Sequence, residues 1–267
     1  MGNDPGIFSL FWETTMKLAA RMERLGTETA FEVLARAKAL EREGRNIIHL
    51  EIGEPDFDTP VNVVAAGVEA LQAGATHYTP SAGIEPLRRA IAEDQSKRKG
   101  LAASPDNVVV TPGGKPIMFY LMLALLEDGD EVIYPDPGFP IYESMVAFCG
   151  ATRRPIGFIE RDGRFQWDVD SLVHQAGPRT KLIIVNTPSN PVGCTVSDDD
   201  LQRIADAAIR HDVFVLSDEI YSRMQYEGSF TSLATLPGMS ERTCVLDGFS
   251  KTYAMTGWRL GYGVMPD

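Results

Sequence analysis

Residues 243–264 read TCVLDGFSKTYAMTGWRLGYGV, two short apolar runs separated by a polar segment that contains Lys251. The runs Thr243–Leu246 and Arg259–Val264 lack clean alternation, which is typical of strands that are buried on both faces. Five similar runs precede them: Val108–Thr111, Glu131–Tyr134, Arg153–Ile156, Leu182–Val185 and Val213–Leu216. Helical patterns lie between most of these runs, and this alternation predicts an α/β domain with a mainly parallel sheet.

Capping residues locate two of the helices. Ser197 precedes three aspartates that suit the positive end of a helix dipole, and an apolar stripe follows, which predicts a helix from Ser197 to about Arg210. Thr59 and Pro60 have the residue types of an N-cap and a first helical position, and they predict a helix that runs to about Gly74.

The N-terminal region carries weaker signals. Residues 1–20 contain several aromatic and aliphatic side chains, which favour an arm that packs on a partner over a disordered tail. The stretch Thr29–Glu32 has the form of a capping box and predicts a helix that ends near Gly44. The run Asn46–Leu50 predicts a short strand.

Composition limits the classes of partner. The chain has 267 residues, of which 44% are hydrophobic and 23% charged, and its formal net charge is -12. These values are ordinary for a globular domain, and the acidic balance argues against binding to nucleic acid or to an anionic membrane surface. The sequence contains no long apolar run and no signal-peptide pattern. We therefore expect a cytoplasmic protein.

The cysteines and histidines do not suggest a metal site. The three cysteines and four histidines are scattered and form no CxxC or HExxH motif: Cys149, Cys194, Cys244, His49, His77, His174 and His211. Three separate thiols are expected to be free rather than paired in disulfides, and neither a structural nor a catalytic metal is expected.

Chemically versatile residues follow four of the predicted strands. They are Gly113, Gly114 and Lys115 after the first strand, Asn190 after the fourth, Asp218 and Tyr221 after the fifth, and Lys251 and Arg259 after the sixth. Each has an ordinary explanation by itself, since a lysine there is usually solvated and an aspartate or glycine usually forms a turn. Together they share the carboxyl edge of one sheet, where ligands of parallel sheets bind.

This combination suits a cofactor that has an aldehyde, a pyridine nitrogen, a phenolic oxygen and a phosphate. Lys251 is the amine that forms a Schiff base with an aldehyde, and Asp218 is the carboxylate that keeps a pyridine nitrogen protonated. A tyrosine hydroxyl can bond the phenolic oxygen. An arginine and the backbone N–H groups of a helix N-terminus bind a phosphate dianion.

The segment from Gly248 to Gly261 resembles the cofactor-lysine signature of the class I/II aminotransferases, which are pyridoxal-phosphate (PLP) enzymes of fold type I. Four further segments resemble the same family in the same order: Gly53–Pro60, Tyr78–Pro80 with Gly83, Asn190-Pro191 with Gly193, and Asp218 with Tyr221. The resemblance covers about residues 27–267. It implies a three-layer α/β/α large domain around a mainly parallel seven-stranded sheet, over residues 60–267, and an N-terminal arm with part of a small domain over residues 1–59.

The resemblance also implies a role for each residue. Lys251 would hold PLP and shuttle a proton, and Asp218 would pair with the pyridine nitrogen. Tyr221 and Asn190 would bond the phenolic oxygen, and Phe139 would stack on the ring. Gly53 and Asn190 would lie near the substrate. Gly113, Gly114, Lys115, Ser250 and Arg259 would hold the phosphate. Tyr78 would reach the phosphate of a second subunit, which implies a homodimer with shared active sites.

Two departures from the family pattern affect these expectations. Gly248 stands where some members have a phosphate-binding serine, so that contact is lost or replaced by backbone. The sequence stops at Asp267, whereas family members continue into a segment that carries the arginine for the substrate carboxylate. We therefore expect a C-terminally truncated chain that does not transaminate at a typical enzymatic rate.

Three functions fit this reading. The first is an aminotransferase that moves an amino group between an L-amino acid and a 2-oxo acid. The second is a PLP-dependent lyase or synthase on the same fold, which shares the cofactor residues. The third is a catalytically inactive fragment. The sequence does not identify the amino acid, because side-chain specificity comes from the shape and distal charges of the pocket.

Overall fold

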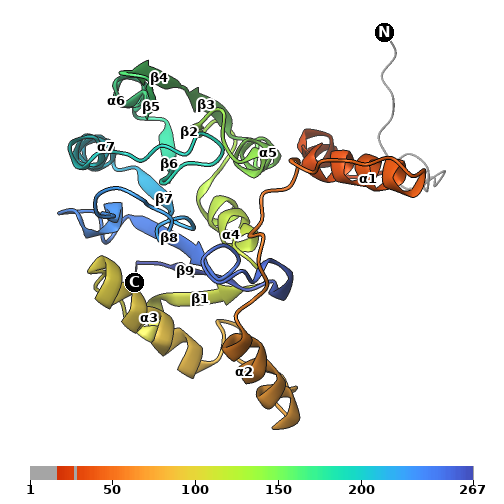
Figure 1. The fold of residues 1–267 in the computed structure, drawn as a ribbon. Coiled ribbons are helices and arrows are strands. Elements are labelled where there is room, and N and C mark those ends of the chain that lie inside the picture. The colour runs from red at the N-terminus through yellow and green to blue at the C-terminus, as the bar shows by residue number, and fades with distance from the viewer. Residues whose placement is uncertain (1–16, 27–28, 267) are drawn as a thin grey trace.

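The computed structural model describes residues 17–26 and 29–266 and has a seven-stranded sheet at its centre (Figure 1). The strands follow the order β1-β9-β8-β7-β6-β2-β3. Their bounds are β1 Val108–Thr111, β2 Glu131–Pro135, β3 Thr152–Ile156, β6 Thr180–Asn186, β7 Phe214–Asp218, β8 Thr243–Gly248 and β9 Gly261–Val264. Neighbours are parallel except where β9 pairs with β1 and β8. The predicted mainly parallel sheet is confirmed.

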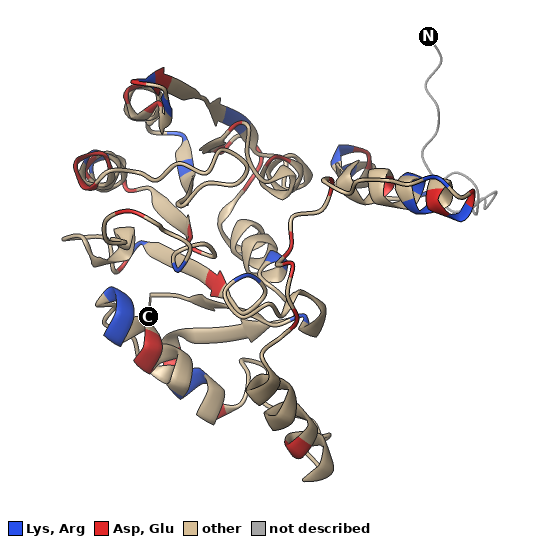
Figure 2. Ribbon diagram, viewed as in Figure 1, with Lys and Arg blue, Asp and Glu red and all other residues tan. Residues whose placement is uncertain are grey.

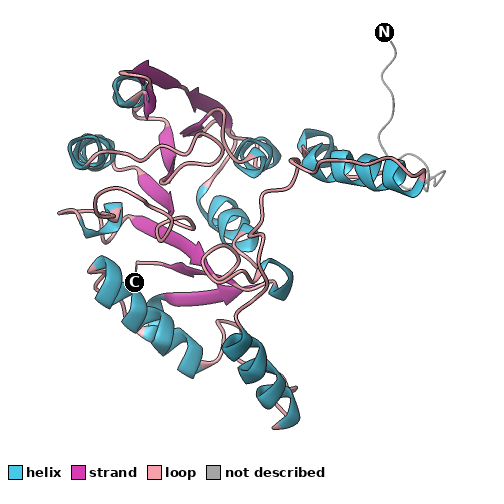
Figure 3. Cartoon of the chain, viewed as in Figure 1, coloured by secondary structure: helices cyan, strands magenta, loops and turns pink. Residues whose placement is uncertain are grey.

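Helices cover both faces of this sheet (Figure 3). Alternate residues of a strand point to opposite faces, and on β6 Leu182 and Ile184 belong to one apolar cluster while Ile183 and Val185 belong to another. The first cluster includes α4 (Lys115–Leu125) and α5 (Pro140–Phe148), and the second includes α6 (Val169–Gln175) and α7 (Asp198–His211). Helix α3 (Glu85–Lys99) packs with Val245 on the same side as α6 and α7. The expected three layers are therefore present.

Helix α7 shows why its boundaries were predictable from the sequence. Ser197 is its N-cap, and the Ser197 hydroxyl accepts a hydrogen bond from the backbone N–H of Asp200. The helix ends at His211, and Asp212 adopts the left-handed conformation with φ 53°. The predicted start at Ser197 is confirmed, and the predicted end differs by one residue.

A two-stranded hairpin lies outside the main sheet, and the sequence analysis did not predict it. Its strands are β4 (Phe158–Arg161) and β5 (Arg164–Trp167), which pair in antiparallel register. The connecting residues Asp162 and Gly163 both have positive φ, 53° and 72°. An Asp-Gly pair with two positive φ values is the signature of a two-residue hairpin turn, so the signal was present in the sequence.

Two expectations for the N-terminal region are wrong. Asn46–Leu50 forms no strand, because no strand edge lies beside this segment to supply backbone partners. Its side chains Ile48 and Leu50 are 83% and 90% exposed. Thr59 does not cap the next helix, α2 (Val61–Gln72), whose N-cap is Pro60. The Thr59 hydroxyl instead donates to the Ala254 carbonyl oxygen at 2.5 Å.

The remaining elements connect these parts. Helix α1 spans Thr29–Arg42, and the short 3-10 helices are η2 (Ala20–Arg24), η3 (Pro105–Asn107), η4 (Leu233–Thr235) and η5 (Thr256–Trp258). The helix predicted from the capping box is thus present, and Gly44 follows it with φ 87°. The expected N-terminal arm falls largely on residues 1–16, outside the described part of the chain.

Candidate active site

The site forms at the edge of the sheet where β1, β6, β7 and β8 end. Strand β9 runs in the opposite direction, so its first residue lies at this same edge, where Gly261 pairs with Thr111 of β1 and with Gly248 of β8. The polar residues that follow the parallel strands are therefore close to Arg259, which precedes β9. This topology brings together residues that are far apart in the sequence, such as Gly113 and Arg259, which are 146 positions apart.

Glycines make room for a guanidinium group at the start of α4. A Cβ at Gly113 would overlap the Arg259 guanidinium, and Gly113 has φ 87°. A Cβ at Gly261 would lie 2.6 Å from the Gly114 nitrogen. The Arg259 Nη1 donates to the Thr256 carbonyl oxygen at 2.7 Å. An arginine beside the N-terminus of a helix is a binding site for an anion such as phosphate.

Asp218, the last residue of β7, is a buried carboxylate that is 3% exposed. The Tyr142 hydroxyl donates to Asp218 Oδ2 at 2.5 Å, and the Ile220 backbone N–H donates to Oδ1 at 3.3 Å. Burial raises the pKa of Asp218 to about 6, with smaller contributions from the charges of Asp247 and Glu219, while the two hydrogen bonds act in the opposite direction. The carboxylate is thus mostly ionised at neutral pH and poised to accept a cationic partner.

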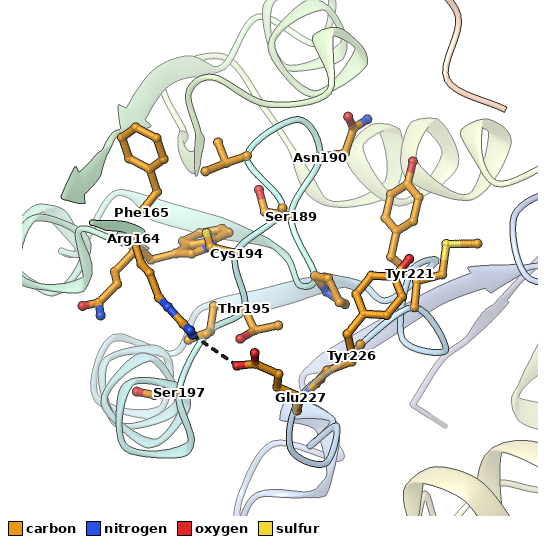
Figure 4. A pocket seen from close by; sticks show the side chains of 18 of the residues that line it. Arg164, Phe165, Ser189, Asn190, Cys194, Thr195, Ser197, Tyr221, Tyr226 and Glu227 are labelled. Atoms are coloured by element: carbon orange, nitrogen blue, oxygen red, sulfur yellow. Dashed lines mark hydrogen bonds and ion pairs between the residues drawn. The ribbon is translucent and has the colours of Figure 1, made fainter. Parts of the chain in front are cut away.

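Tyr221 and Asn190 lie beside Asp218. Burial, together with the negative charge of Asp218, raises the pKa of Tyr221 to about 12, so its hydroxyl stays protonated and can donate. The Asn190 backbone N–H donates to Asn186 Oδ1 at 2.7 Å, and the Asn186 amide donates to the Asp218 carbonyl oxygen at 3.1 Å. This chain of bonds fixes the loop that carries Asn190. Figure 4 shows Asn190 and Tyr221 on the same side of a cavity of about 800 Å³.

Lys251 lies in the loop between β8 and β9 and is half-buried. Its Nζ donates to the Gly53 carbonyl oxygen at 2.5 Å. Burial lowers the pKa of Lys251, partly offset by the negative charge of Glu54. A lysine with a lowered pKa has more of the neutral amine, which is the nucleophilic form that attacks an aldehyde.

The loop 53–60 is attached to the lysine loop by side-chain bonds that the sequence analysis missed. The Thr256 hydroxyl donates to Glu54 at 3.0 Å, and Trp258 Nε1 donates to the Thr59 hydroxyl at 3.1 Å. Thr59 also donates to Ala254, as described above. The sequence singled out both segments but had no signal that they contact one another.

Lys115 and Phe139 form a separate group on the α4 side of the site. The Lys115 Nζ lies 5.7 Å from the centroid of the Phe139 ring and 5.8 Å from that of Phe31 in α1, distances that suit cation–π interactions. Phe139 in turn packs edge-on against Tyr142, with ring centroids 5.8 Å apart. The Lys115 side chain therefore lies between two aromatic rings.

The other predicted residues occupy less defined positions. Ser250 is half-buried in the same loop as Lys251. Gly53 contributes its carbonyl oxygen to Lys251, and a Cβ at Gly53 would touch nothing within 4 Å. Tyr78 is fully exposed.

In residues 17–26 and 29–266 no cluster of three or more His, Cys, Asp or Glu side chains is arranged to hold a metal ion. None of the helices in that part of the chain is long and apolar enough to cross a membrane.

The donor set matches the chemical groups of PLP. A half-buried amine, a buried carboxylate with a raised pKa, a protonated tyrosine hydroxyl and an arginine at a glycine-lined helix N-terminus share one edge of the sheet. Gly113 lies so close to Arg259 that any side chain at position 113 would collide with the guanidinium group.

Comparisons with known proteins point to a single family. The family model for class I and II aminotransferases matches residues 45–267. A probable aspartate/prephenate aminotransferase of Thermus aquaticus is 40% identical over 249 residues, which are 93% of this chain and 64% of that protein. An aromatic-amino-acid aminotransferase of Thermococcus litoralis is 39% identical over 254 residues, with 94% and 64% coverage.

A solved structure shows the same fold. The aspartate aminotransferase of Thermus thermophilus, determined with maleate, superposes with a TM-score of 0.90 at 38% identity and covers 94% of this chain and 65% of its own. The chain thus spans about 64% of the length of the curated relatives that it matches.

Proposed function

Because the chain belongs to the class I and II aminotransferase family, we propose that it acts as a PLP-dependent aminotransferase, moving an amino group between an L-amino acid and a 2-oxo acid. The observation that carries this proposal is the half-buried Lys251, with a lowered pKa, on the same sheet edge as Asp218 and Arg259. An amine, an acid and an anion site in one place are what a phosphorylated pyridine aldehyde requires.

Bound PLP supplies an aldehyde for covalent attachment and a ring that accepts electron density from the substrate carbon. Lys251 holds the cofactor and later moves a proton to or from that carbon. Asp218 holds a proton on the ring nitrogen, and the Tyr142 hydroxyl fixes the orientation of its carboxylate. Tyr221 donates to the phenolic oxygen together with Asn190. Arg259, Ser250 and the backbone of Gly113–Lys115 hold the phosphate, while Phe139 covers the ring.

Aspartate is the first amino donor to test. The Thermus aquaticus relative is named for aspartate and prephenate, and the Thermus thermophilus structure for aspartate. The Lys115 ammonium group, 5.7 Å from the centroid of the Phe139 ring, would supply a positive charge for the acidic side chain of aspartate. The Thermococcus litoralis relative is named for aromatic amino acids, so an aromatic donor is the second. Gly53 and Asn190 complete the proposed substrate contacts.

The proposal includes a homodimer. Helix α2 presents an apolar stripe to solvent, formed by Val61, Val64, Val68 and Leu71, which are 83%, 42%, 48% and 65% exposed. Figure 2 shows that α2 carries little charge, and Glu69 is its only charged residue. Tyr78, which follows this helix, is fully exposed. A second copy of the chain that covers α2 would bring Tyr78 to the phosphate site of its neighbour.

The division into domains is part of the same proposal. Residues 1–59 would form an arm and part of a small domain, and residues 60–267 the PLP-binding domain. In support, α1 stands apart from the sheet (Figure 1), and its only buried residue is Ala37. A cytoplasmic location is also proposed, since Cys149, Cys194 and Cys244 are all free, as expected in a reducing compartment.

Cofactor attachment tests the proposal directly. The purified chain is mixed with PLP, reduced with borohydride and digested, and the modified peptide is identified by mass spectrometry. We expect a visible absorbance band before reduction and PLP on Lys251 after it, with both lost in Lys251→Ala. Lys97→Ala, which removes a lysine from α3, is the control and should retain both. A band of equal intensity in Lys251→Ala would contradict the assignment.

A half-reaction separates the aminotransferase from the lyase. The PLP-loaded protein is mixed with aspartate or an aromatic amino acid, and the released products are quantified. An aminotransferase gives one equivalent of the corresponding 2-oxo acid per site and no free ammonia. Release of ammonia together with an oxo acid that has lost its β-substituent, the products of β-elimination, would favour the lyase. The absence of product from every donor would favour the catalytically inactive fragment.

A further inference from the structure

A buried ion cluster lies behind the candidate site and has no role in the function proposed above. Lys99, the last residue of α3, places its Nζ 2.7 Å from Glu219 Oε2 and 2.9 Å from Asp247 Oδ2. The side chains of the three residues are 1%, 0% and 4% exposed. Lys99 is the only lysine or arginine that is buried in the described part of the chain. Burying such a group is costly, so its retention calls for an explanation.

The cluster is built so that each carboxylate is fully bonded. Glu219 Oε1 accepts from the hydroxyls of Ser217 and Ser232 at 2.8 and 2.6 Å. Asp247 Oδ1 accepts from the Gly248 backbone N–H at 2.7 Å, and its Oδ2 accepts from Gln95 Nε2 at 3.3 Å as well as from Lys99. The Lys99 ammonium is therefore the group that neutralises both acids, with Arg98 at 3.6 Å from Asp247 as a weaker second cation.

The position of these acids connects the cluster to Asp218. Glu219 is the next residue along the chain, and Asp247 follows Leu246, the register partner of Asp218 on β8. The charges of Asp247 and Glu219 both raise the pKa of Asp218, in addition to burial. The other titratable groups that face Asp218 are Tyr142 from α5 and Tyr221 from the loop after β7. Asp94 and Tyr262 lie near Arg98, and Tyr262 also lies near Asp247.

We propose that Lys99 is a positioning residue whose buried ammonium cancels the charges of Glu219 and Asp247, so that Asp218 remains an anion facing the cofactor ring. The inference rests on the proposed function of Asp218. Without Lys99, three buried carboxylates would share one region and at least one would take up a proton. Proton uptake by Asp218 would remove the negative charge that holds a proton on the ring nitrogen.

Lys99 could also serve only as a structural salt bridge. The test must therefore measure the effect of its charge on Asp218 and not its effect on packing. The readout is the titration midpoint of Asp218 in the protein without cofactor, followed by carbon-13 NMR of labelled aspartate carboxyls. The Asp218 signal is assigned by its loss in Asp218→Asn. This readout does not depend on catalysis, so a failure of the proposed function and a failure of this inference are distinguishable.

Four variants should differ in their effect on the Asp218 midpoint. Lys99→Met, which removes the ammonium group but keeps an unbranched apolar stem, should raise the Asp218 midpoint by about half a pH unit or more. Glu219→Gln, which removes one negative charge, should lower it. The double variant Lys99→Met/Glu219→Gln should lie above Glu219→Gln and close to the wild type. Lys99→Arg keeps the charge and should leave the midpoint near its original value.

The comparison of the double variant with Glu219→Gln still isolates Lys99 if Lys99→Met alone does not fold. Equal midpoints in these two proteins would overturn the proposal and leave Lys99 as a structural pair only. With PLP added, Lys99→Met should also weaken cofactor binding about two- to threefold between pH 5 and 6, where the raised midpoint leaves less of Asp218 ionised, whereas Lys99→Arg should not. If PLP still attaches to Lys251 while the Asp218 midpoint is unmoved in every variant, the proposed function stands and this inference is wrong.

Discussion

Asp218 illustrates how one buried residue connects function with stability. In the unfolded chain its pKa returns to the ordinary value of 3.8, whereas burial raises it to about 6 in the folded protein. The folded state therefore binds the proton more tightly, and stability contributed by Asp218 is lost as pH rises from about 4 through 6. The ionised carboxylate is a cost that a bound cationic ring nitrogen would offset.

We predict that Asp218→Asn removes this pH dependence in the protein without cofactor. Relative to the wild type, the variant should gain stability as pH rises from about 4 to 7, by up to about 3 kcal/mol, the free energy that corresponds to the pKa difference. The measurement is the free energy of unfolding in urea at several pH values. Tyr142 can still donate to the asparagine oxygen, but the amide group then faces the Ile220 N–H, which adds a loss of stability that does not depend on pH. A constant difference between the two proteins across this range would contradict the assigned pKa.

At the same scale, sequence reasoning selected Lys251, Asp218, Tyr221 and Arg259 because each follows or precedes a strand at one edge of the sheet. It could not select Tyr142, whose hydroxyl reaches Asp218 from a helix 76 positions away in the chain. It also passed over Lys99, because a lysine at the end of the charged run Lys97–Lys99 has the pattern of a solvent-facing helix terminus. Partners of this kind depend on tertiary packing, which local patterns do not encode.

Among the elements, the turn between β1 and α4 has the strictest requirement for glycine. Gly113 has φ 87°, and a Cβ there would overlap the Arg259 guanidinium. We predict that Gly113→Ala displaces this guanidinium and weakens the binding of PLP and of inorganic phosphate by about tenfold, about 1.4 kcal/mol. The measurement is the dissociation constant from the visible absorbance of PLP, with calorimetry for phosphate.

Gly129→Ala is the matched control for this substitution. Gly129 also has a positive φ, 97°, but a Cβ there would meet nothing within 4 Å. Both variants should lose about 1–2 kcal/mol of stability from backbone strain, while only Gly113→Ala should lose anion affinity. Equal losses of affinity in the two variants would show that the effect is general destabilisation.

Elements were predicted well where the pattern is internal to the element and poorly where it depends on neighbours. All seven strands of the sheet were located. The central strands leave a compact apolar run in the sequence because they are buried on both faces, although the edge strand β3 is mostly exposed and only its Ile156 is buried. Asn46–Leu50 has a similar composition but lies beside no strand, so its backbone remains unpaired. The β4–β5 hairpin was missed although Asp162-Gly163 is a strong turn signal.

For the whole molecule, the exposed stripe on α2 leads to a prediction about assembly. We expect the chain to sediment as a dimer, because an apolar helix face of this kind is seldom left in water. The double variant Val64→Glu/Val68→Glu places two charges in the stripe and should shift the protein to monomer, as measured by sedimentation equilibrium. Both side chains are half-exposed, 42% and 48%, so a large loss of monomer stability is not expected.

Ile209→Glu is the control for the added charge, since Ile209 is 41% exposed on α7 and lies outside the α2 stripe. It should remain a dimer. A wild-type chain that is monomeric at all concentrations would contradict the proposed homodimer, and with it the role of Tyr78. A double variant that stays dimeric would instead show that the dimer contact does not involve the α2 stripe.

The antiparallel strand β9 has a consequence for the order in which a newly synthesised chain becomes competent to take up its cofactor. It lies between β1 and β8, so a nascent chain that has emerged only as far as β8 holds these two strands with an unfilled gap between them. The contact of Arg259 and Gly261 with Gly113 forms only when this gap is closed. We therefore expect the proposed lysine anchor and anion pocket to be completed together, only after β9 has left the ribosome and inserted between β1 and β8.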